Sequence, residues 1–281
     1  MKKLGFIIVN YNDLKNTLKL INNIKDYKSI DKIVVVDNAS TDNSVKELAN
    51  NKSIKLIESK ENLGYSGAIN LGAKYLLKEY KDLNIIISNS DIIIPSEDVI
   101  INLNNMIDDN NVCAMPVVKE NKELKYGWKL TSHKKDLLMN IPFLNRLYRD
   151  DIRYYPNDYF KGIVPVDVIY GCFFIIDGNT LKKIGYMDEH TFLYYEEYIL
   201  ARKLENIKKK SLINCDISVI HHHNVSIGTN VSRINKFKIY KKSQLYYEKN
   251  YNDASSLTIV LLYLFYNLTL LSLKIKGLFK K

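Results

Sequence analysis

Short apolar runs that end abruptly on polar residues recur along the first third of the chain. Residues 5–9 form one such run and stop at Asn10, and residues 33–36 form a second and stop at Asp37. Between the two runs, apolar side chains recur at the spacing of a helix, at Leu14, Leu18, Ile21 and Ile24. A strand, a helix and a second strand in this order predict a βαβ unit with parallel strands.

The same alternation continues as far as residue 88. Strands are predicted at residues 54–57 and 84–88, and helices from Ser40 or Thr41 to Leu48 and over residues 66–80. Strands that alternate with helices predict an α/β fold, in which a mostly parallel sheet is covered by helices on both faces. In sheets of this kind, ligands bind at the carboxyl ends of the strands.

Polar side chains gather where these strands end. They are Asn10, Tyr11 and Asn12 after the first strand, Asp37 and Asn38 after the second, and Asn89, Ser90 and Asp91 after the fourth. Taken singly, each Asn, Asp or Ser fits a turn or a helix cap, because these residue types favour both. Taken together, they predict one crevice whose amides and carboxylates suit a base and a ribose. Asp91 suits Mg²⁺ or Mn²⁺ held together with the phosphates of a nucleotide diphosphate.

Several classes of protein are disfavoured by what the sequence lacks. No GxGxxG follows the first strand and no GxxxxGK[ST] occurs, so neither a dinucleotide-binding fold nor a P-loop is indicated. The three cysteines have no CxxC spacing, which predicts neither a disulfide framework nor a zinc site and favours a reducing compartment. The apolar stretch at residues 4–10 is too short for a signal peptide, so we expect the chain to begin in the cytoplasm.

Composition and the end of the chain point towards an anionic partner. The formal net charge of +10 favours a nucleotide phosphate, a nucleic acid or an acidic membrane surface. Residues 257–273 form an almost wholly apolar run of 17 residues, at the low edge of the roughly 17 to 25 needed to cross a bilayer. Four lysines follow it, and residues 236–251 before it interleave lysine with tyrosine. The pattern favours a helix that touches a membrane over an internal core helix.

Six motifs, in this order, carry a resemblance to a known family. They are "VNYN", "VVDNASTDNS", "ENLGYSGAINLGA", "ISNSD", "YGCFFII" and "FLYYEE". The chain resembles family 2 of the inverting glycosyltransferases, in particular the rhamnosyltransferase-like bacterial branch, from residue 4 to about residue 230.

The resemblance implies a GT-A fold and a division of the chain. Residues 1–230 would form the glycosyltransferase domain, with the nucleotide-sugar half at about 1–118 and the acceptor half at about 119–230. Residues 231–281 would form a basic, aromatic and apolar helical tail. The implied activity is the transfer, with inversion, of a sugar from a nucleotide diphosphate donor to a glycan or lipid-linked acceptor in cell-surface polysaccharide synthesis. The implied location is the cytoplasm, at the inner face of the membrane. No nucleic-acid partner is expected.

The resemblance also assigns residues to the donor site. In the nucleotide pocket it places Asn10, Tyr11, Asn12, Asp37 and Asn38; beside the sugar nucleotide, Asn62, Gly64 and Asn70; and in the metal-binding motif, Asn89, Ser90 and Asp91. Only Asp91 of that motif offers a carboxylate to Mg²⁺ or Mn²⁺, since Asn89 stands in the first position. His221 corresponds to a histidine that binds metal or phosphate. Three successive strand residues alternate sides, so only His221 and His223 of the triplet share a face.

The same resemblance implies that Glu197 is the general base that takes the proton of the acceptor hydroxyl. Without the family, Glu196 and Glu197 are explained by their favourable charge at the start of a helix that carries Leu200 and Leu204. Residues 120–165 have few periodic features and predict a loop region whose role the sequence leaves open. Its aromatic residues, with Trp128 among them, either stack on an acceptor sugar or pack internally, and packing is favoured.

Two other functions are compatible with parts of the sequence. A sugar-1-phosphate nucleotidyltransferase shares nucleotide binding on an α/β sheet, but it would normally carry a glycine-rich, basic loop where this chain has "IIVNYNDL". A non-catalytic basic protein that binds membrane surfaces or nucleic acid would explain the charge. The ordered polar residues at the strand ends disfavour it.

Overall fold

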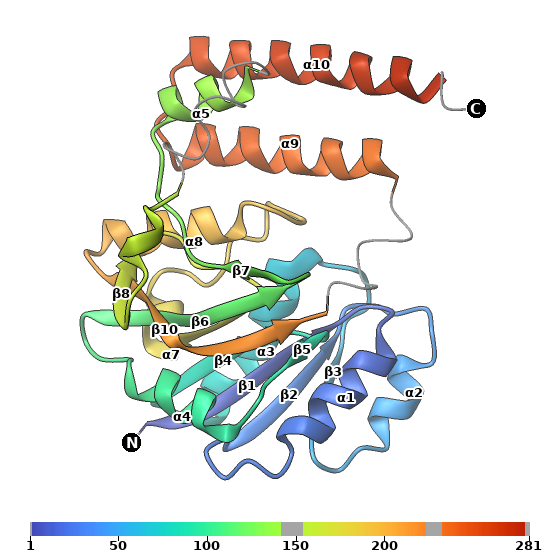
Figure 1. Ribbon diagram of the computed structural model, residues 1–281. Coiled ribbons are helices and arrows are strands. Elements are labelled where there is room, and N and C mark those ends of the chain that lie inside the picture. The colour runs from blue at the N-terminus through green and yellow to red at the C-terminus, as the bar shows by residue number, and fades with distance from the viewer. Residues whose placement is uncertain (1, 142–153, 223–231, 279–281) are drawn as a thin grey trace.

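The computed structural model describes residues 2–141, 154–222 and 232–278, and its elements follow the predicted alternation (Figure 1). The strands are β1 Lys3–Asn10, β2 Lys32–Asp37, β3 Lys55–Glu58, β4 Leu83–Asn89, β5 Ile92–Ile93, β6 Asn111–Glu120, β7 Glu123–Lys125, β8 Ile163–Val166, β9 Phe173–Asp177 and β10 Lys210–His221. The helices are α1 Leu14–Ile24, α2 Ser44–Ala49, α3 Gly64–Glu79, α4 Glu97–Asn105, α5 His133–Asn140, α7 Gly178–Lys183, α8 Glu196–Asn206, α9 Arg233–Asn250 and α10 Ser256–Leu278, with a 3₁₀ turn at Asn157–Tyr159.

One sheet runs through the protein in the order β3-β2-β1-β4-β9-β6-β10-β5, with β7 beside β6 and β8 beside β10. The first four strands of this order are parallel, as the sequence predicts. β9 is antiparallel to both β4 and β6, whereas β10 runs parallel to β6. Helices α1 and α4 cover one face of the sheet and α3 and α7 cover the other (Figure 1).

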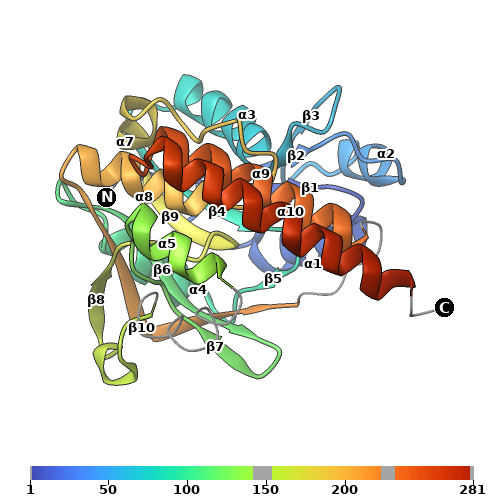
Figure 2. The same ribbon diagram turned by 90° about the horizontal axis from the view of Figure 1, so that it is seen from above.

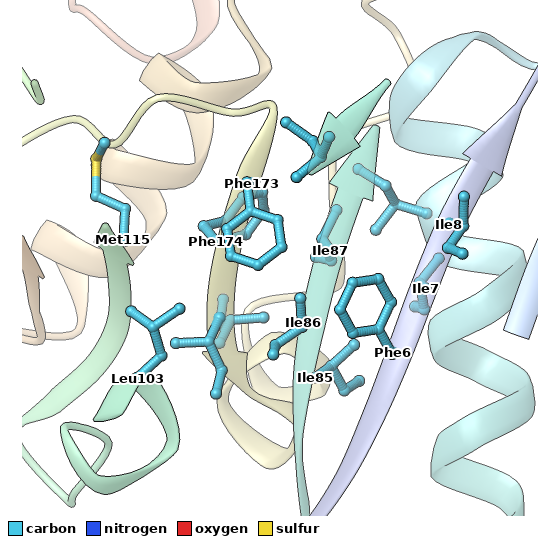
Figure 3. Close-up of a cluster of buried hydrophobic side chains, with 14 of the residues drawn as sticks. Phe6, Ile7, Ile8, Ile85, Ile86, Ile87, Leu103, Met115, Phe173 and Phe174 are labelled. Carbon is cyan, nitrogen blue, oxygen red and sulfur yellow. The ribbon is translucent and has the colours of Figure 1, made fainter. Parts of the chain in front are cut away.

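The core lies between the central strands and the helices. Figure 3 shows buried side chains of β1, β4 and β9 in contact, with Leu103 of α4 and Met115 of β6 beside them. The rings of Phe6 and Phe173 are 6.2 Å apart at an angle of 52°. Both rings are fully buried, so each removes a large apolar surface from water. The core thereby fixes the relative positions of the strands whose ends carry polar residues.

Helix α2 begins later than the sequence predicts. It starts at Ser44 with Asn43 at the N-cap, so the expected cap at Ser40 or Thr41 is wrong. The Ser40 hydroxyl accepts hydrogen bonds from the backbone N–H of Asn12 at 2.9 Å and from the side chain of Asn10 at 3.2 Å. A hydroxyl that holds the first strand-end loop cannot also cap a helix.

Residues 120–165 contain more regular structure than the sequence predicts. Within its described part lie β7, α5, the 3₁₀ turn and most of β8. Residues 142–153 fall outside the described part. The expectation of a loop region is therefore wrong for those elements, whose short lengths left no periodic signal.

Helices α9 and α10 lie one above the other over the sheet (Figure 1), and the view from above shows α10 running in front of α9, with α5 next to it (Figure 2). Helix α9 packs on α8, where Tyr247 is fully buried against Tyr195 and Tyr198. Helix α10 rests on α9 and α5, and Phe237 stacks on Tyr266 with 5.7 Å between ring centroids.

Candidate functional site

The predicted strand-end residues meet along one edge of the sheet. β1, β2 and β4 are parallel, so their carboxyl ends lie together. β9 is antiparallel to β4, so the residues that precede β9 reach the same edge. The backbone N–H of Asn89 donates to the carbonyl of Cys172 at 2.8 Å and joins the two segments. The site is thus built from both halves of the chain.

A pocket of about 230 Å³ opens at this edge. Six of the predicted donor-site residues line it: Tyr11, Asn38, Asn62, Gly64, Asn89 and Ser90. Tyr65 and the segment from Phe192 to Tyr194 add an aromatic wall, and Lys236 and Ile239 of α9 close it from the C-terminal side. This contribution of α9 was not predicted, because the interleaved lysines and tyrosines of residues 236–251 indicated a membrane interface.

Asn10 and Asp37 lie behind the pocket. Both are buried, and the Asn10 amide donates to Asp37 Oδ2 at 2.7 Å while its own oxygen accepts from Thr17 at 2.7 Å. Asp37 Oδ1 accepts from the backbone N–H of Ser40 at 2.9 Å. The two side chains therefore tie the ends of β1 and β2 together, and direct contact of either with a nucleotide stays a prediction.

Asn12 and Asn38 shape the two loops beside the pocket. Asn12 has a positive φ of 53°, and its side-chain oxygen accepts from the backbone N–H of Thr41 at 2.6 Å. The Asn38 amide donates to Asn62 at 2.9 Å and to the carbonyl of Gly64 at 3.1 Å. The start of α3 is thereby fastened to the end of β2, so that residues 62–64 face the pocket.

Gly64 occupies a position that only glycine fits. Its φ is +74°, and a Cβ atom there would lie 2.3 Å from the carbonyl oxygen of Phe192. That same oxygen accepts from the backbone N–H of Tyr65 at 3.1 Å. Further along α3, the buried Asn70 exchanges hydrogen bonds with the backbone of Met187 at 2.9 and 3.0 Å. Asn70 is therefore a link between α3 and the segment before α8, outside the pocket wall.

Asp91 and His221 come together at the end of β10. His221 Nε2 lies 3.1 Å from Asp91 Oδ1, and His221 Nδ1 lies 3.6 Å from Glu120 Oε1. All three side chains are buried. Tyr170 donates to the other oxygen of Glu120 at 2.8 Å, which orients that carboxylate towards the histidine. His222 is exposed, and His223 lies outside the described residues.

Two carboxylates of this site, Glu120 and Asp13, were not predicted from the sequence. Glu120 ends β6 and so obeys the strand-end rule that found Asp37 and Asp91, but it was assigned to the start of a loop. Asp13 follows Asn12 directly, and it accepts a hydrogen bond from Ser90 at 2.6 Å. Burial raises the pKa of Asp13, and the charge of Asp91 raises it further. The position of Asp13 directly after the strand-end residues, in the sequence "NYND", could have indicated that it belongs to the site.

The carboxylate pair stands at the start of α8, as predicted. Tyr194 and Tyr195 both have φ of 70°, a conformation that non-glycine residues rarely adopt and that often occurs at functional sites. Burial raises the pKa of Glu196 well above its ordinary value, and the charge of Glu197 adds to it. Glu196 Oε2 is buried and accepts no hydrogen bond from any described residue.

Glu197 faces the segment that leads into β9. A Cβ atom on Gly171 would lie 2.4 Å from Glu197 Oε1, so the absence of a side chain there gives the carboxylate its place. Burial also raises the pKa of Glu197, while hydrogen bonds with the backbone, including that of Gly171, lower it in part. The Gly171 carbonyl accepts from the Tyr65 hydroxyl at 2.9 Å, so Gly171 joins Glu197 to a residue of the pocket wall.

The candidate acceptor aromatics mostly pack internally, as favoured from the sequence. Trp128 makes an edge contact with Tyr170, with ring centroids 6.0 Å apart. Tyr155 stacks on Tyr159 at 4.5 Å. Tyr154 is exposed.

The chain that carries this site also matches the model of a known protein family. The model of glycosyl transferase family 2 matches residues 6–185, which is more than half of the chain. The chain belongs to glycosyl transferase family 2. The family membership expected from the six motifs is therefore confirmed, and so is the GT-A fold.

Similar proteins extend this picture. Over 209 residues, the family 2 chain is 29% identical to the low-salt glycan biosynthesis hexosyltransferase Agl10 of Haloferax volcanii; the match covers 73% of this chain but only 62% of Agl10. Among solved structures, GalNAc-T7 with UDP, GalNAc and Mn²⁺ matches with a TM-score of 0.62 and 13% identity, over 89% of this chain and 50% of that one. TarS 1–349 of S. aureus in complex with UDP-GlcNAc matches with a TM-score of 0.58 and 16% identity, over 94% and 71%. The structural matches establish the fold.

Proposed function

We propose that this protein is an inverting glycosyltransferase that moves a sugar from a nucleotide diphosphate donor to a glycan or lipid-linked acceptor in cell-surface polysaccharide synthesis. The observation that carries the proposal is the pocket at the ends of β1, β2 and β4 in a family 2 chain, with the pair Glu196 and Glu197 beyond its aromatic wall. The similar proteins support it, since Agl10 is a hexosyltransferase of glycan biosynthesis and the TarS structure contains UDP-GlcNAc.

In this proposal, the nucleotide of the donor lies in the pocket against Tyr11, Asn38 and Asn62. An aromatic ring and side-chain amides suit a flat base with donors and acceptors on its edge. Asn10 and Asp37 act from behind by fixing the two strand ends. Lys236 adds a positive charge to the wall, which favours a diphosphate.

A divalent cation, Mg²⁺ or Mn²⁺, fits beside the diphosphate. Asp91 would hold it, with His221 as the second protein ligand, since these buried side chains already meet at 3.1 Å. Within the part of the chain that the structure describes, no group of three His, Cys, Asp or Glu side chains is arranged to hold a metal. Asp91 and His221 alone offer only two protein ligands, which suits an ion that completes its coordination shell with phosphate oxygens and water. When bound, the ion neutralises negative charge on the leaving diphosphate.

Glu197 is the proposed base. The acceptor hydroxyl attacks the anomeric carbon from the face opposite the diphosphate, and a new carbon–oxygen bond forms as the bond to the diphosphate oxygen breaks. The hydroxyl proton passes to a Glu197 carboxylate oxygen, and the diphosphate leaves with the bonding electrons. Attack from the opposite face inverts the anomeric configuration. A raised pKa of Glu197 brings the base closer to the operating pH, where proton transfer is most effective.

The protein would work in the cytoplasm at the inner face of the membrane, where a lipid-linked acceptor is available. Within the described residues, one helix is long and apolar enough to cross a membrane, over Ser256–Ile275, with a mean hydropathy of 1.8. Only 11% of that stretch is buried inside the protein. An apolar helix so little covered supports contact with lipid.

A thermal-shift screen of nucleotide sugars with and without Mn²⁺ tests the donor and metal proposals together. A matching donor at about a hundred times its dissociation constant stabilises the fold by about 2.7 kcal/mol. With Asp91→Asn, we expect the Mn²⁺-dependent part of the shift to disappear and transfer to be abolished. The matched control is Asp26→Asn, which makes the same change at an exposed position. An Asp91→Asn protein with full activity and the full Mn²⁺ effect would exclude this metal site.

A further inference from the structure

Helix α10 carries a continuous apolar stripe on its solvent side. The stripe consists of Leu257, Val260, Leu264, Leu268, Leu271 and Ile275, which recur every three or four residues and are all exposed. Thr258 and Leu262, which lie on the other side of the helix, are buried. A contiguous apolar surface of this kind on a folded protein marks an interaction site for a protein or a membrane.

The surroundings of the stripe carry charge of one sign. The three packed helices carry exposed lysines, at Lys134 and Lys135 of α5, at Lys238, Lys242 and Lys249 of α9, and at Lys274 of α10. The carboxylates of α5 and α9, Asp136 and Glu248, are both buried. Among the side chains described on these helices, no carboxylate is exposed; Asp253 in the turn between α9 and α10 is. The surface therefore combines apolar contact with positive charge.

We propose that this surface, which we term the lysine-flanked face, binds an anionic lipid bilayer with α10 lying parallel to the membrane plane. The proposal rests on the membrane association put forward above and specifies its geometry. An interfacial helix of this kind sinks its apolar side about 5 to 10 Å into the boundary between headgroups and acyl chains. Lysines beside it interact with anionic headgroups.

The packing of α10 disfavours a transmembrane orientation. Its length would suffice, because 20 helical residues extend about 30 Å. However, α10 packs on α9 and α5, and the Phe237–Tyr266 stack joins α9 to α10. A spanning α10 would carry the exposed lysines of α9 into hydrocarbon or would have to separate from both helices. Parallel contact keeps the packing and leaves the lysines at headgroup level.

A second copy of the chain is a poorer partner for the same face. In a symmetric dimer, each surface meets itself, so a face flanked by lysines would meet another with the same charges. Like charges opposed across an interface disfavour association. Anionic lipids offer the complementary sign.

Binding to vesicles tests the face itself. The variant Leu264→Glu with Leu268→Glu places two carboxylates on side chains that are 50% and 54% exposed. Its matched control is Leu124→Glu with Ile163→Glu, two aliphatic residues of the same exposures, 50% and 54%, on β7 and β8. With vesicles of phosphatidylcholine and phosphatidylglycerol, we expect the first pair to lower partitioning about tenfold or more and the control pair to leave it unchanged. Equal losses in both pairs would overturn the proposal.

Depth measurements test the orientation. Leu257→Trp, Leu264→Trp and Leu271→Trp introduce probes that span about 21 Å along the stripe. Quenching by brominated lipids should report the same shallow depth at all three positions, with the partly buried Trp128 of the unsubstituted protein as background. A probe at residue 264 that lies deeper than the other two would mean that α10 spans the bilayer, and would overturn the proposal.

Further outcomes separate this proposal from the proposed function. If the protein does not bind vesicles and light scattering shows a dimer, the proposed membrane contact of this face is wrong. Glycosyl transfer would then still be judged by the nucleotide-sugar screen. Shallow, uniform depth supports the lysine-flanked face even when no donor binds, because the vesicle measurements contain no nucleotide sugar. A circular dichroism spectrum and a melting temperature close to those of the unsubstituted protein would show that loss of lipid binding in the Leu264→Glu, Leu268→Glu variant is not a loss of fold.

Discussion

At the scale of single residues, the adjacent carboxylates of α8 have different surroundings. Glu196 is buried with an oxygen that accepts no hydrogen bond from any described residue, whereas Glu197 is half-buried against Gly171. Successive helical side chains point about 100° apart, so the two cannot serve one hydroxyl equally. The geometry favours Glu197 as the base, and Glu196 as a side chain that supports the start of the helix.

We expect Glu197→Gln to lower kcat by roughly 10² to 10⁴, the usual contribution of a general base, with little change in donor binding. Glu196→Gln should cost much less. Because burial raises the pKa of Glu197, kcat/KM should rise with pH through that raised pKa, and this limb should be absent from Glu197→Gln. Transfer assays and nucleotide titrations on both variants separate the roles: equal losses would indicate a shared site, and a loss confined to Glu196→Gln would reverse the assignment.

Gly64→Ala should destabilise the protein more than Gly185→Ala does. The two glycines have nearly the same positive φ, +74° and +75°, but only Gly64 faces a backbone oxygen, whereas a Cβ on Gly185 meets nothing within 4 Å. Backbone strain alone costs about 1 to 2 kcal/mol, and the clash at Gly64 adds to it. Urea unfolding of both variants measures the difference. Equal free energies of unfolding would show that the segment at Phe192 moves away freely.

At the scale of elements, a buried polar cluster joins α5, α8 and α9. Asn252 donates from one amide to Asp136 at 3.0 Å and to Glu248 at 2.9 Å, and Arg202 donates to the Asn252 oxygen at 2.6 Å. Burial raises the pKa of Glu248 to about 9, and the charge of Asp136 contributes. Glu248 is therefore neutral in the folded protein over much of the range in which an unfolded chain would ionise it.

This cluster predicts a stability that falls as pH rises. The folded state keeps a proton on Glu248 that the unfolded state releases, so stability is greatest below the ordinary glutamate value of 4.5 and is lost progressively towards pH 9. We expect Glu248→Gln, which is neutral at every pH, to reduce this slope and to raise the midpoint of thermal unfolding at pH 8. Melting curves from pH 5 to pH 9 check it. Identical slopes in both proteins would show that the proton is held elsewhere.

The elements also show what a sequence pattern can and cannot predict. Helix α1 begins and ends where the periodicity placed it, because its apolar residues pack against the core: Ile21 and Ile24 are buried, and Leu14 and Leu18 are partly buried. The direction of β9 was not predictable, since a fully buried strand is apolar on both faces whichever way it runs. The link from Asn70 to Met187 joins residues 117 positions apart, and no local pattern reports such a contact. Asn10 was found as a strand-end residue, but its burial behind the pocket depends on packing.

At the scale of the whole molecule, the C-terminal helices contribute differently. Helix α9 is anchored by Tyr247 and by the hydrogen bond of Ser243 to the Leu193 carbonyl at 2.8 Å, whereas α10 buries few side chains. Deleting residues 255–281 should therefore move the protein from the membrane fraction to the soluble fraction while sparing donor hydrolysis. Loss of the contacts of α10 should lower thermal stability by only a few degrees, corresponding to about 1 to 2 kcal/mol. Fractionation and nucleotide titration check both points, and a truncated protein that no longer binds nucleotide would make α10 part of the core.

The position of α9 has a consequence for how the protein is made. The pocket is bounded by Val9 from the first strand and by Ile239 from α9, so its walls come from segments that are far apart in the sequence. During synthesis, the early strands emerge from the ribosome and can pair long before α9 is available. Contacts between such distant segments form late, because a long loop must close first. A nascent chain thus carries an incomplete pocket until α9 has been translated.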